Sequence, residues 1–447
     1  MNRNVLIVQS GGPSPVINAS LQGVIEACLA YPDSFGRIYA GFHGVEGVLC
    51  EQLLDLSAQP KSELRLLKTT PSASAAGTCR YRLSDETDSD LRRILDVFRA
   101  HDIGYFFCIG GNDSMDTANR VDRFAAQNGY PLIVTGIPKT IDNDVGDEAF
   151  QMLDHTPGYG SCARYWALNM QNAEEENRAM YPSECVSVYQ AMGRRAGFIT
   201  AAARLGDPER QFPMLLFFAE TGVGLEALSE RVNAVLKREK RCIVVVNEGL
   251  DIGESGARHD AFGHIEYGAS GLTAMQAVVS YLNGHHLCAR GQATGQIPGV
   301  MQRSCSLFLS ETDVKEAYEV AVSAVQTAQK QRSGLMATIC RAKTDAYQAV
   351  YGTVPLEVVA NSERFLPKTW ITADGTDVTD DFVRYARPLI GERPVEIPFE
   401  NGLQRFARLE KRFVEQKLKP YCPVHFRENS EIFYEGCQNG TQNGRNS

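Results

Sequence analysis

The sequence predicts an α/β protein with two doubly wound parallel-sheet (Rossmann-like) domains that face each other across a cleft. In the first half, residues 4–8 and 104–109 are apolar runs, each followed by a diglycine and a helical pattern. In the second half, strand-like runs at 184–189, 214–218 and 242–249 alternate with helical patterns. This alternation is typical of βαβ units, whose ligands bind at the carboxyl ends of the strands.

The first of these units has a loop that suits an anion. Ser10-Gly11-Gly12 follows the strand, and residues 16–26 have helical spacing. The N–H groups of a diglycine can approach a negative group closely, and a helix N-terminus adds favourable partial charge. The loop matches neither GxGxxG nor a Walker A motif. Taken alone, it is more typical of an ordinary connection.

The next two segments add further polar groups. Residues 68–82 form a loop rich in small and hydroxyl residues, which ends in Arg80 and Arg82 and could deliver guanidinium groups to phosphate. The second diglycine precedes Asn112-Asp113-Ser114 and a helix expected from residue 115 to 126. Asp113 or Ser114 could simply cap this helix, a role compatible with catalysis.

The central stretch is Pro138–Asp144, which follows a strand predicted over residues 131–137. Asp142 and Asp144 lie two residues apart beside Lys139. One carboxylate could accept a proton from an attacking hydroxyl, the other could hold Mg²⁺, and the ammonium could offset phosphate charge. An Asx-rich turn is the alternative, and the two diglycine loops nearby argue against it.

The rest of the chain carries fewer signals. A helix is expected from Thr312 to about Lys330. After about residue 341 the motifs become sparse, and residues 429–447, rich in Asn, Gly and Gln, predict a disordered tail.

Composition excludes several classes of protein. The net charge of −9 argues against nucleic-acid binding, and no window approaches 18 uninterrupted apolar residues, which argues against a membrane span. The 12 cysteines are scattered singly, without a CxxC pair. With no export signal at the N-terminus, we expect reduced thiols and a cytoplasmic location.

Together, these motifs resemble the phosphofructokinase family, in particular its pyrophosphate-dependent branch. The resemblance covers roughly residues 4–340 and rests on seven segments in the same order: Ser10-Gly11-Gly12, Gly77-Thr78-Cys79-Arg80, Gly110-Gly111-Asn112-Asp113-Ser114, Pro138–Asp144, Met192-Gly193-Arg194, Asn247-Glu248-Gly249 and Gln302-Arg303. The resemblance implies a phosphoryl-donor domain at 1–155 plus 300–340, a sugar-phosphate domain at 156–299 and a C-terminal extension at 341–447.

The implied reaction is reversible transfer of phosphate from pyrophosphate to the 1-hydroxyl of fructose 6-phosphate. By position, Asp142 matches the general base, with Lys139 and Arg194 as further catalytic residues, and Asp113 and Asp144 match the Mg²⁺ site. The implied donor-binding residues are Gly12, Arg80, Asp113, Ser114 and Lys139. The implied substrate-binding residues are Thr140, Asp142, Met192, Gly193, Arg194, Glu248 and Arg303.

The donor preference also has a physical argument. Members that use ATP have glycine at the positions of Asp113 and Lys139. A carboxylate at residue 113 stands where a nucleotide's α-phosphate would pass, and two unit charges about 4 Å apart repel by ~4 kcal/mol at an effective dielectric of about 20. Lys139 supplies a cation for a small leaving group. We therefore expect pyrophosphate, not ATP, as the donor.

The acceptor is less well defined by the sequence. Arg303 is retained, but Cys185, Thr294 and Val300 fall where relatives commonly carry basic residues, His or Tyr. A different sugar, polyol or sugar phosphate is therefore an alternative acceptor.

Two further classes of protein conflict with the sequence. A catalytically silent paralogue conflicts with the presence of Asp142, Asp144 and Arg194. A dinucleotide-dependent oxidoreductase conflicts with the absence of GxGxxG after the first strand. Because family members place sugar-site arginines across a subunit interface, we expect a homodimer or homotetramer.

Overall fold

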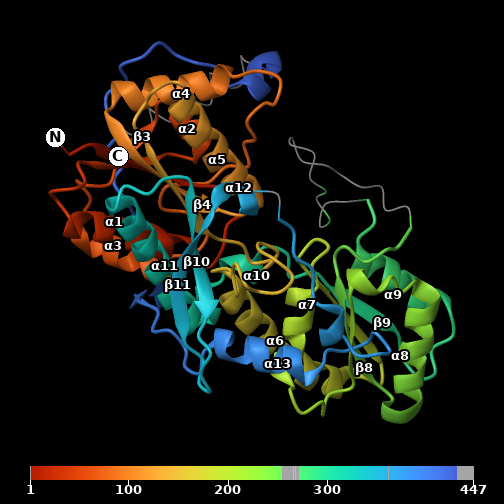
Figure 1. Cartoon of the computed structure of the whole chain (residues 1–447). Coiled ribbons are helices and arrows are strands. Elements are labelled where there is room, and N and C mark those ends of the chain that lie inside the picture. Colours follow the sequence, from red (N-terminus) through yellow and green to blue (C-terminus); the bar gives the residue numbers. More distant parts are fainter. Residues whose placement is uncertain (1, 254–264, 266, 268–270, 361, 430–447) are drawn as a thin grey trace.

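The chain forms two lobes, each built around a mainly parallel β-sheet (Figure 1). The computed structural model describes residues 2–253, 265, 267, 271–360 and 362–429. The tail predicted to be disordered lies, apart from Asn429, outside the described residues. The expected α/β class and its two doubly wound sheets are confirmed.

The larger sheet belongs to the N-terminal lobe. Its strands, in hydrogen-bonded order, are β11 (Ala349–Pro355), β10 (Leu335–Arg341), β5 (Ile133–Pro138), β4 (Ile103–Gly110), β1 (Asn4–Gln9), β2 (Ile38–Gly41) and β3 (Leu53–Asp55). The strands from β10 to β2 are parallel to their neighbours, whereas the two edge strands pair antiparallel. The antiparallel pairing of the two edge strands was not predicted.

Helices cover this sheet and bury its apolar strands. They are α1 (Ile17–Ala30), α2 (Val45–Leu49), α3 (Lys61–Leu66), α4 (Ser89–Ala100), α5 (Asn112–Gln127), α11 (Glu311–Gln329) and α12 (Leu356–Val359). Val5, Leu6, Ile7 and Val8 are all fully buried, as expected for a strand covered on both faces. The first turn of α11 begins one residue before the expected start, and Ser310 caps it by accepting the N–H of Asp313.

The smaller sheet, in the second lobe, has the order β7 (Met214–Phe217), β8 (Cys242–Asn247), β6 (Val186–Ala191) and β9 (Ala293–Gln296), all parallel. Its helices are α6 (Tyr159–Met180), α7 (Phe198–Ala202), α8 (Leu225–Glu239), α9 (Ala274–Gly284) and α10 (Met301–Ser304). Alternate residues of β8 enter two separate cores, Ile243 and Val245 on one face, Val244 and Val246 on the other.

Residues after 341 contact both lobes. Strand β11 completes the larger sheet, and Leu366 and Phe382, the latter from α13 (Asp380–Ala386), enter a core of the second lobe. The chain then passes the short hairpin of β12 (Phe399–Glu400) and β13 (Leu403–Gln404) and returns to the N-terminal lobe (Figure 1). The predicted division into three domains stays a prediction.

Among the helices of the described residues, none combines the length and the apolar character needed to cross a bilayer.

Candidate active site

A cleft of about 640 Å³ lies where loops from both sheets meet. Its walls follow the carboxyl ends of β1, β4 and β5 in the first lobe and of β6 and β8 in the second. All the predicted site residues except Gly193 line it: Gly12, Arg80, Asp113, Ser114, Lys139, Thr140, Asp142, Asp144, Met192, Arg194, Glu248 and Arg303. Parallel strands therefore bring these distant segments to one place.

Lys139 lies deep in the cleft, immediately after β5. Its side chain is only 3% exposed, and Nζ donates a 2.6 Å hydrogen bond to the carbonyl of Gly12. Burial, and after it the nearby charge of Arg303, lowers the pKa of Lys139 to about 8. An anion bound here would restore the charged ammonium by supplying an opposite charge.

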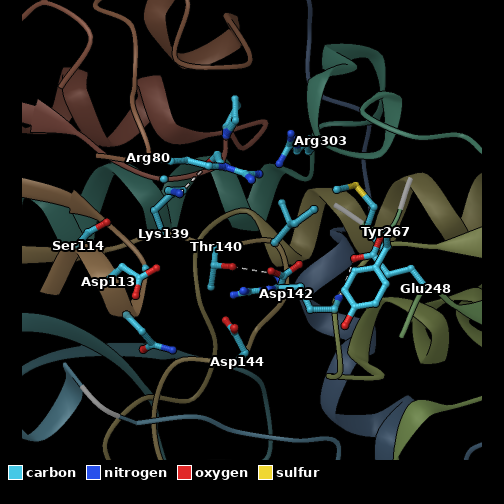
Figure 2. A pocket seen from close by; sticks show the side chains of 18 of the residues that line it. Arg80, Asp113, Ser114, Lys139, Thr140, Asp142, Asp144, Glu248, Tyr267 and Arg303 are labelled. Carbon is cyan, nitrogen blue, oxygen red and sulfur yellow. Dashed lines mark hydrogen bonds between the residues drawn. The ribbon is translucent and has the colours of Figure 1, made fainter. Parts of the chain in front are cut away.

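The N-terminus of α5 forms another wall. Asp113 is exposed in the first turn of the helix and Ser114 is buried, with both side chains on the same side of the view in Figure 2. The preceding Asn112 also lines the cleft, and its buried Oδ1 accepts no hydrogen bond from the described residues. Helix N–H groups and these side chains together provide donors and oxygen ligands beside the diglycine.

Asp142 and Asp144 enter the cleft from one turn. The N–H of Asp142 donates to Oγ1 of Thr140 at 3.1 Å, drawn as a dashed line in Figure 2. Burial raises the pKa of Asp142, with a further contribution from Glu248, and burial followed by the charge of Asp142 raises the pKa of Asp144. A carboxylate with a raised pKa is a stronger base, which suits proton abstraction from a hydroxyl.

Glu248 organises the opposite loop in the second lobe. Its Oε1 accepts the N–H groups of Gly193 and Arg194, at 3.1 and 2.8 Å. Gly193 itself therefore does not line the cleft but shapes the turn that carries Arg194, with φ values of 120° and 53° at the two residues. Burial raises the pKa of Glu248.

Arg303 crosses from α10 toward the first diglycine. A Cβ on Gly12 would lie 2.7 Å from Nη1 of Arg303, which is closer than any normal contact. Glycine at residue 12 thus allows a guanidinium to lie against the loop backbone. In Figure 2, Arg80, Arg303 and Lys139 lie above Asp142, so three cationic side chains are found on one side of the carboxylate.

Cys185, Thr294 and Val300, the positions at which the sequence left the acceptor undefined, differ in whether they line the cleft. Cys185 is fully buried and Thr294 donates to Glu184 at 3.1 Å, and neither lines the cleft. Val300 does line it and is 57% exposed. None of the three supplies a charge to the cleft.

Sequence reasoning missed several residues of the cleft. Gln302 lies within a quoted motif, but its role was not foreseen: Oε1 accepts from Trp166 Nε1 and from the Met192 N–H. The other missed lining residues include Gln190 and Tyr267, together with Ser362 and Glu363 from the C-terminal part. The last two stand in a segment without any motif, so the sequence offered no signal for them.

The fold and the cleft define a two-lobed α/β protein with a cleft between its lobes that is lined by Arg80, Lys139, Arg194 and Arg303. The family model described as phosphofructokinase matches residues 4–328. The chain belongs to the phosphofructokinase family, which confirms the resemblance seen in the sequence.

Three similar proteins narrow the comparison. A pyrophosphate–fructose 6-phosphate 1-phosphotransferase from Halomonas elongata is 38% identical over 428 residues, covering 94% of this chain and 99% of the relative. The solved structure of a pyrophosphate-dependent phosphofructokinase from Nitrosospira multiformis has a TM-score of 0.84 and 34% identity, and the match covers 94% of this chain and all of that one. A sulfofructose kinase from Alkalicoccus urumqiensis is 30% identical, covering 82% of this chain and 91% of the relative.

Proposed function

We propose that this protein transfers a phosphoryl group reversibly between pyrophosphate and the 1-hydroxyl of fructose 6-phosphate, giving fructose 1,6-bisphosphate and phosphate. The names of the full-length relatives support this reaction. The observation that carries it in this chain is the cleft, which gathers Asp142, Lys139 and Arg194 from loops of both lobes.

In this mechanism Asp142 is the general base. It accepts the proton of the 1-hydroxyl as that oxygen forms a bond to the nearer phosphorus of pyrophosphate. The bond between that phosphorus and the bridging oxygen breaks, and inorganic phosphate leaves with the electron pair. Lys139 and Arg80 face the charge of the leaving group, and Arg194 and Arg303 face the transferred group and the sugar phosphate.

Donor-binding roles are proposed for Gly12, Arg80, Asp113, Ser114 and Lys139. Substrate-binding roles are proposed for Thr140, Met192, Arg194, Glu248 and Arg303. Gly193 would act on the sugar site indirectly, because its N–H is already bonded to Glu248.

We propose that Mg²⁺ is the cofactor, held by Asp113 and Asp144. Two carboxylates beside an anion site suit Mg²⁺, which commonly binds one or two protein carboxylates, substrate phosphates and water. The described residues contain no cluster of three His, Cys, Asp or Glu that would hold a metal without substrate. The bound ion would neutralise phosphate charge. A homodimer or homotetramer stays part of the proposal.

The direct test is a donor and base assay on purified protein with fructose 6-phosphate and Mg²⁺. We expect turnover with pyrophosphate to exceed turnover with ATP. The Asp142→Asn variant keeps the shape of the turn but removes the base, so kcat should fall by roughly 10²–10⁴-fold. Faster turnover with ATP would contradict the donor, and near-normal activity of the variant would remove Asp142 from its role.

A second acceptor class follows from one of the relatives and from the sequence. The sulfofructose kinase relative is named for a sugar with a sulfonate, and Cys185 and Thr294 leave the second lobe without the cations expected at those positions. Assays with fructose 6-phosphate, its 6-sulfonate analogue and unphosphorylated sugars distinguish the proposed acceptor from the alternative. The highest kcat/KM with fructose 6-phosphate would dismiss the alternative.

A further inference from the structure

A buried arginine from the C-terminal part of the chain lies directly behind the turn that carries Asp142. Arg364 is 0% exposed and follows the chain segment that leaves α12. Its guanidinium donates to three oxygens: Nε to the carbonyl of Asn143 at 3.0 Å, Nη2 to Oδ1 of Asn143 at 2.9 Å and Nη1 to the carbonyl of Leu153 at 2.7 Å.

The backbone of Arg364 adds a fourth contact to the same turn. Its N–H donates to the carbonyl of Asp144 at 2.8 Å. Arg364 therefore donates to the carbonyl groups of Asn143 and Asp144, two consecutive residues. Asn143 directly follows the proposed base, Asp142, and Asp144 is the proposed metal ligand.

The turn needs such support because Asn143 adopts a left-handed conformation, with φ of 57°, while fully buried. Non-glycine residues seldom adopt this conformation, and surrounding contacts must maintain it. Besides Arg364, the N–H of Thr156 donates to Oδ1 of Asn143, and Oη of Tyr385 accepts from its Nδ2 at 2.9 Å. Two of the three residues that hold Asn143 thus come from the C-terminal part.

The charge of Arg364 is also unusual for a purely structural residue. Its guanidinium contacts three oxygens of Asn143 and Leu153 and the ring of Phe150, 4.3 Å from Cζ. The charges of Asp154, Asp144 and Asp147 act on it from farther away. Burial still lowers the pKa of Arg364, because burial disfavours the charged form. Its position behind Asp142 and Asp144 places a fixed positive charge where two carboxylates share one turn.

We propose that Arg364 is a positioning residue, whose guanidinium holds the Asn143 peptide and thereby sets the directions in which Asp142 and Asp144 enter the cleft. The inference deepens the proposed function and rests on it, because Asp142 needs this placement only as the base of that reaction. Arg364 itself does not line the cleft.

The test compares Arg364→Lys with Arg204→Lys in the full-length protein. Lysine keeps the charge but loses the planar group that reaches three oxygens at once. Arg204 is equally buried, at 1%, and bonds Asp207 and Asp377 away from the cleft, so it controls for the loss of a buried guanidinium. Thermal unfolding of each variant measures how far the fold is affected.

We expect Arg364→Lys to lower kcat by roughly 10–100-fold, the effect of a misplacement of about 1 Å, with KM for pyrophosphate changed less than about 3-fold. The kcat of folded Arg204→Lys should match the wild type. If Arg364→Lys does not fold, Tyr385→Phe removes the hydroxyl that accepts from Asn143 and donates to the carbonyl of Asp154 at 2.8 Å, and its kcat should fall by about 2–5-fold.

A double variant separates positioning from general damage. In the Asp142→Asn background the base is already absent, so Arg364→Lys should cost a smaller factor in kcat than in the wild type. Equal factors in both backgrounds, or an unchanged kcat in Arg364→Lys and Tyr385→Phe, would overturn the inference. A wild-type protein that does not turn over pyrophosphate and fructose 6-phosphate would instead refute the proposed function.

Discussion

At the scale of single residues, the cleft depends on a lysine whose charge is easily lost. The pKa of Lys139 is lowered to about 8, first by burial and then by the charge of Arg303. The group is therefore charged below about pH 8 and neutral above it. A neutral amine would neither bind pyrophosphate electrostatically nor face the leaving phosphate.

We accordingly predict that kcat/KM for pyrophosphate declines as the pH rises through about 8. A Lys139→Met variant should be slower and should lack this alkaline decline, because its side chain has no proton to lose. Measurement of kcat/KM between pH 6 and pH 9.5 in both proteins checks the prediction. The same alkaline decline in the methionine variant would assign it to another group.

Gly12 makes a different contribution, since it leaves space for Arg303. The Gly12→Ala change would place Cβ 2.7 Å from Nη1 of Arg303 and force the guanidinium away. We predict a rise of roughly 10-fold in KM for pyrophosphate, the size expected from losing one charge-assisted hydrogen bond.

Gly224→Ala is the matched control for this change. A Cβ at residue 224 meets nothing within 4 Å, and φ there is −77°, so alanine fits. Its steady-state kinetics should equal those of the wild type. Equal KM values in both alanine variants would contradict the proposed role of Gly12.

The sequence predicted which side chains line the cleft better than it predicted which residues hold those side chains in position. Asp142, Asp113 and Glu248 follow strands, and the ends of parallel strands must meet. No such rule predicts the position of Arg364, because its partners are backbone carbonyls that lie more than 200 positions earlier in the sequence. The proposed roles of the lining residues stay predictions.

At the scale of elements, a buried histidine ties three segments of the first lobe. His155 contacts Asp154 through Nδ1 at 2.8 Å and Glu316 of α11 through Nε2 at 2.7 Å. Arg341 of β10 donates twice to Asp154, at 3.1 and 3.0 Å. Burial alone would lower the pKa of His155, but Glu316 and Asp154 together outweigh it and raise the pKa to about 9.

This arrangement makes stability depend on pH. In the unfolded chain the pKa of histidine is about 6.5, so the folded protein holds the proton more tightly. The stabilisation is fully present below about pH 6.5 and is lost as the pH rises through 9. By linkage, a shift of this size corresponds to about 3 kcal/mol of unfolding free energy.

Urea unfolding at pH 6 and pH 9.5 measures the effect. We predict a lower free energy of unfolding at pH 9.5 in the wild type and a smaller difference in His155→Gln, which cannot take up the proton. An equal pH dependence in the two proteins would contradict the role of His155.

Several elements were predicted from their local patterns, whereas others, including α4 and α6, were not. The strands at β1, β4, β5, β6, β7 and β8 and the helices α1, α5, α8 and α11 agree with the sequence patterns in type and place. The predicted start of α5 was wrong, because the helix begins at Asn112 and its N-cap is Gly111, not Asp113 or Ser114. The helix α6 was not predicted, because its buried face includes Ala163, Ala167 and Glu174. Glu174 is buried only because Arg241 bonds both its oxygens, a partner that no local pattern reveals.

At the scale of the whole molecule, the C-terminal part joins the two lobes. Leu356 and Val359 enter the core of the first lobe, whereas Leu366 and Phe382 enter a core of the second. The sequence predicts an extension from residue 341 but not which parts of the fold it contacts. Its apolar side chains belong to the cores of both lobes, and local motifs carry no information about such distant contacts.

We predict that Phe382→Ala lowers the free energy of unfolding by about 3–5 kcal/mol, because it removes a fully buried ring from the second lobe. Phe399→Ala is the control, since that ring is 58% exposed, and its effect should stay within about 0.5 kcal/mol. Denaturant unfolding measures both. Similar values for the two variants would show that the C-terminal part does not support the second lobe.

The contact between Arg364 and Asn143 spans 221 positions of the chain, which has a consequence for synthesis. A ribosome adds about 5–20 residues per second, so the proposed base emerges roughly 11–44 s before the arginine that steadies it. Nascent chains that end before Arg364 carry both diglycine loops and Asp142, yet they lack the arginine that binds Asn143. Phosphotransfer should therefore be slow until Arg364 has emerged, and a ribosome-stalled fragment that ends before Arg364 should turn over more slowly than the whole chain.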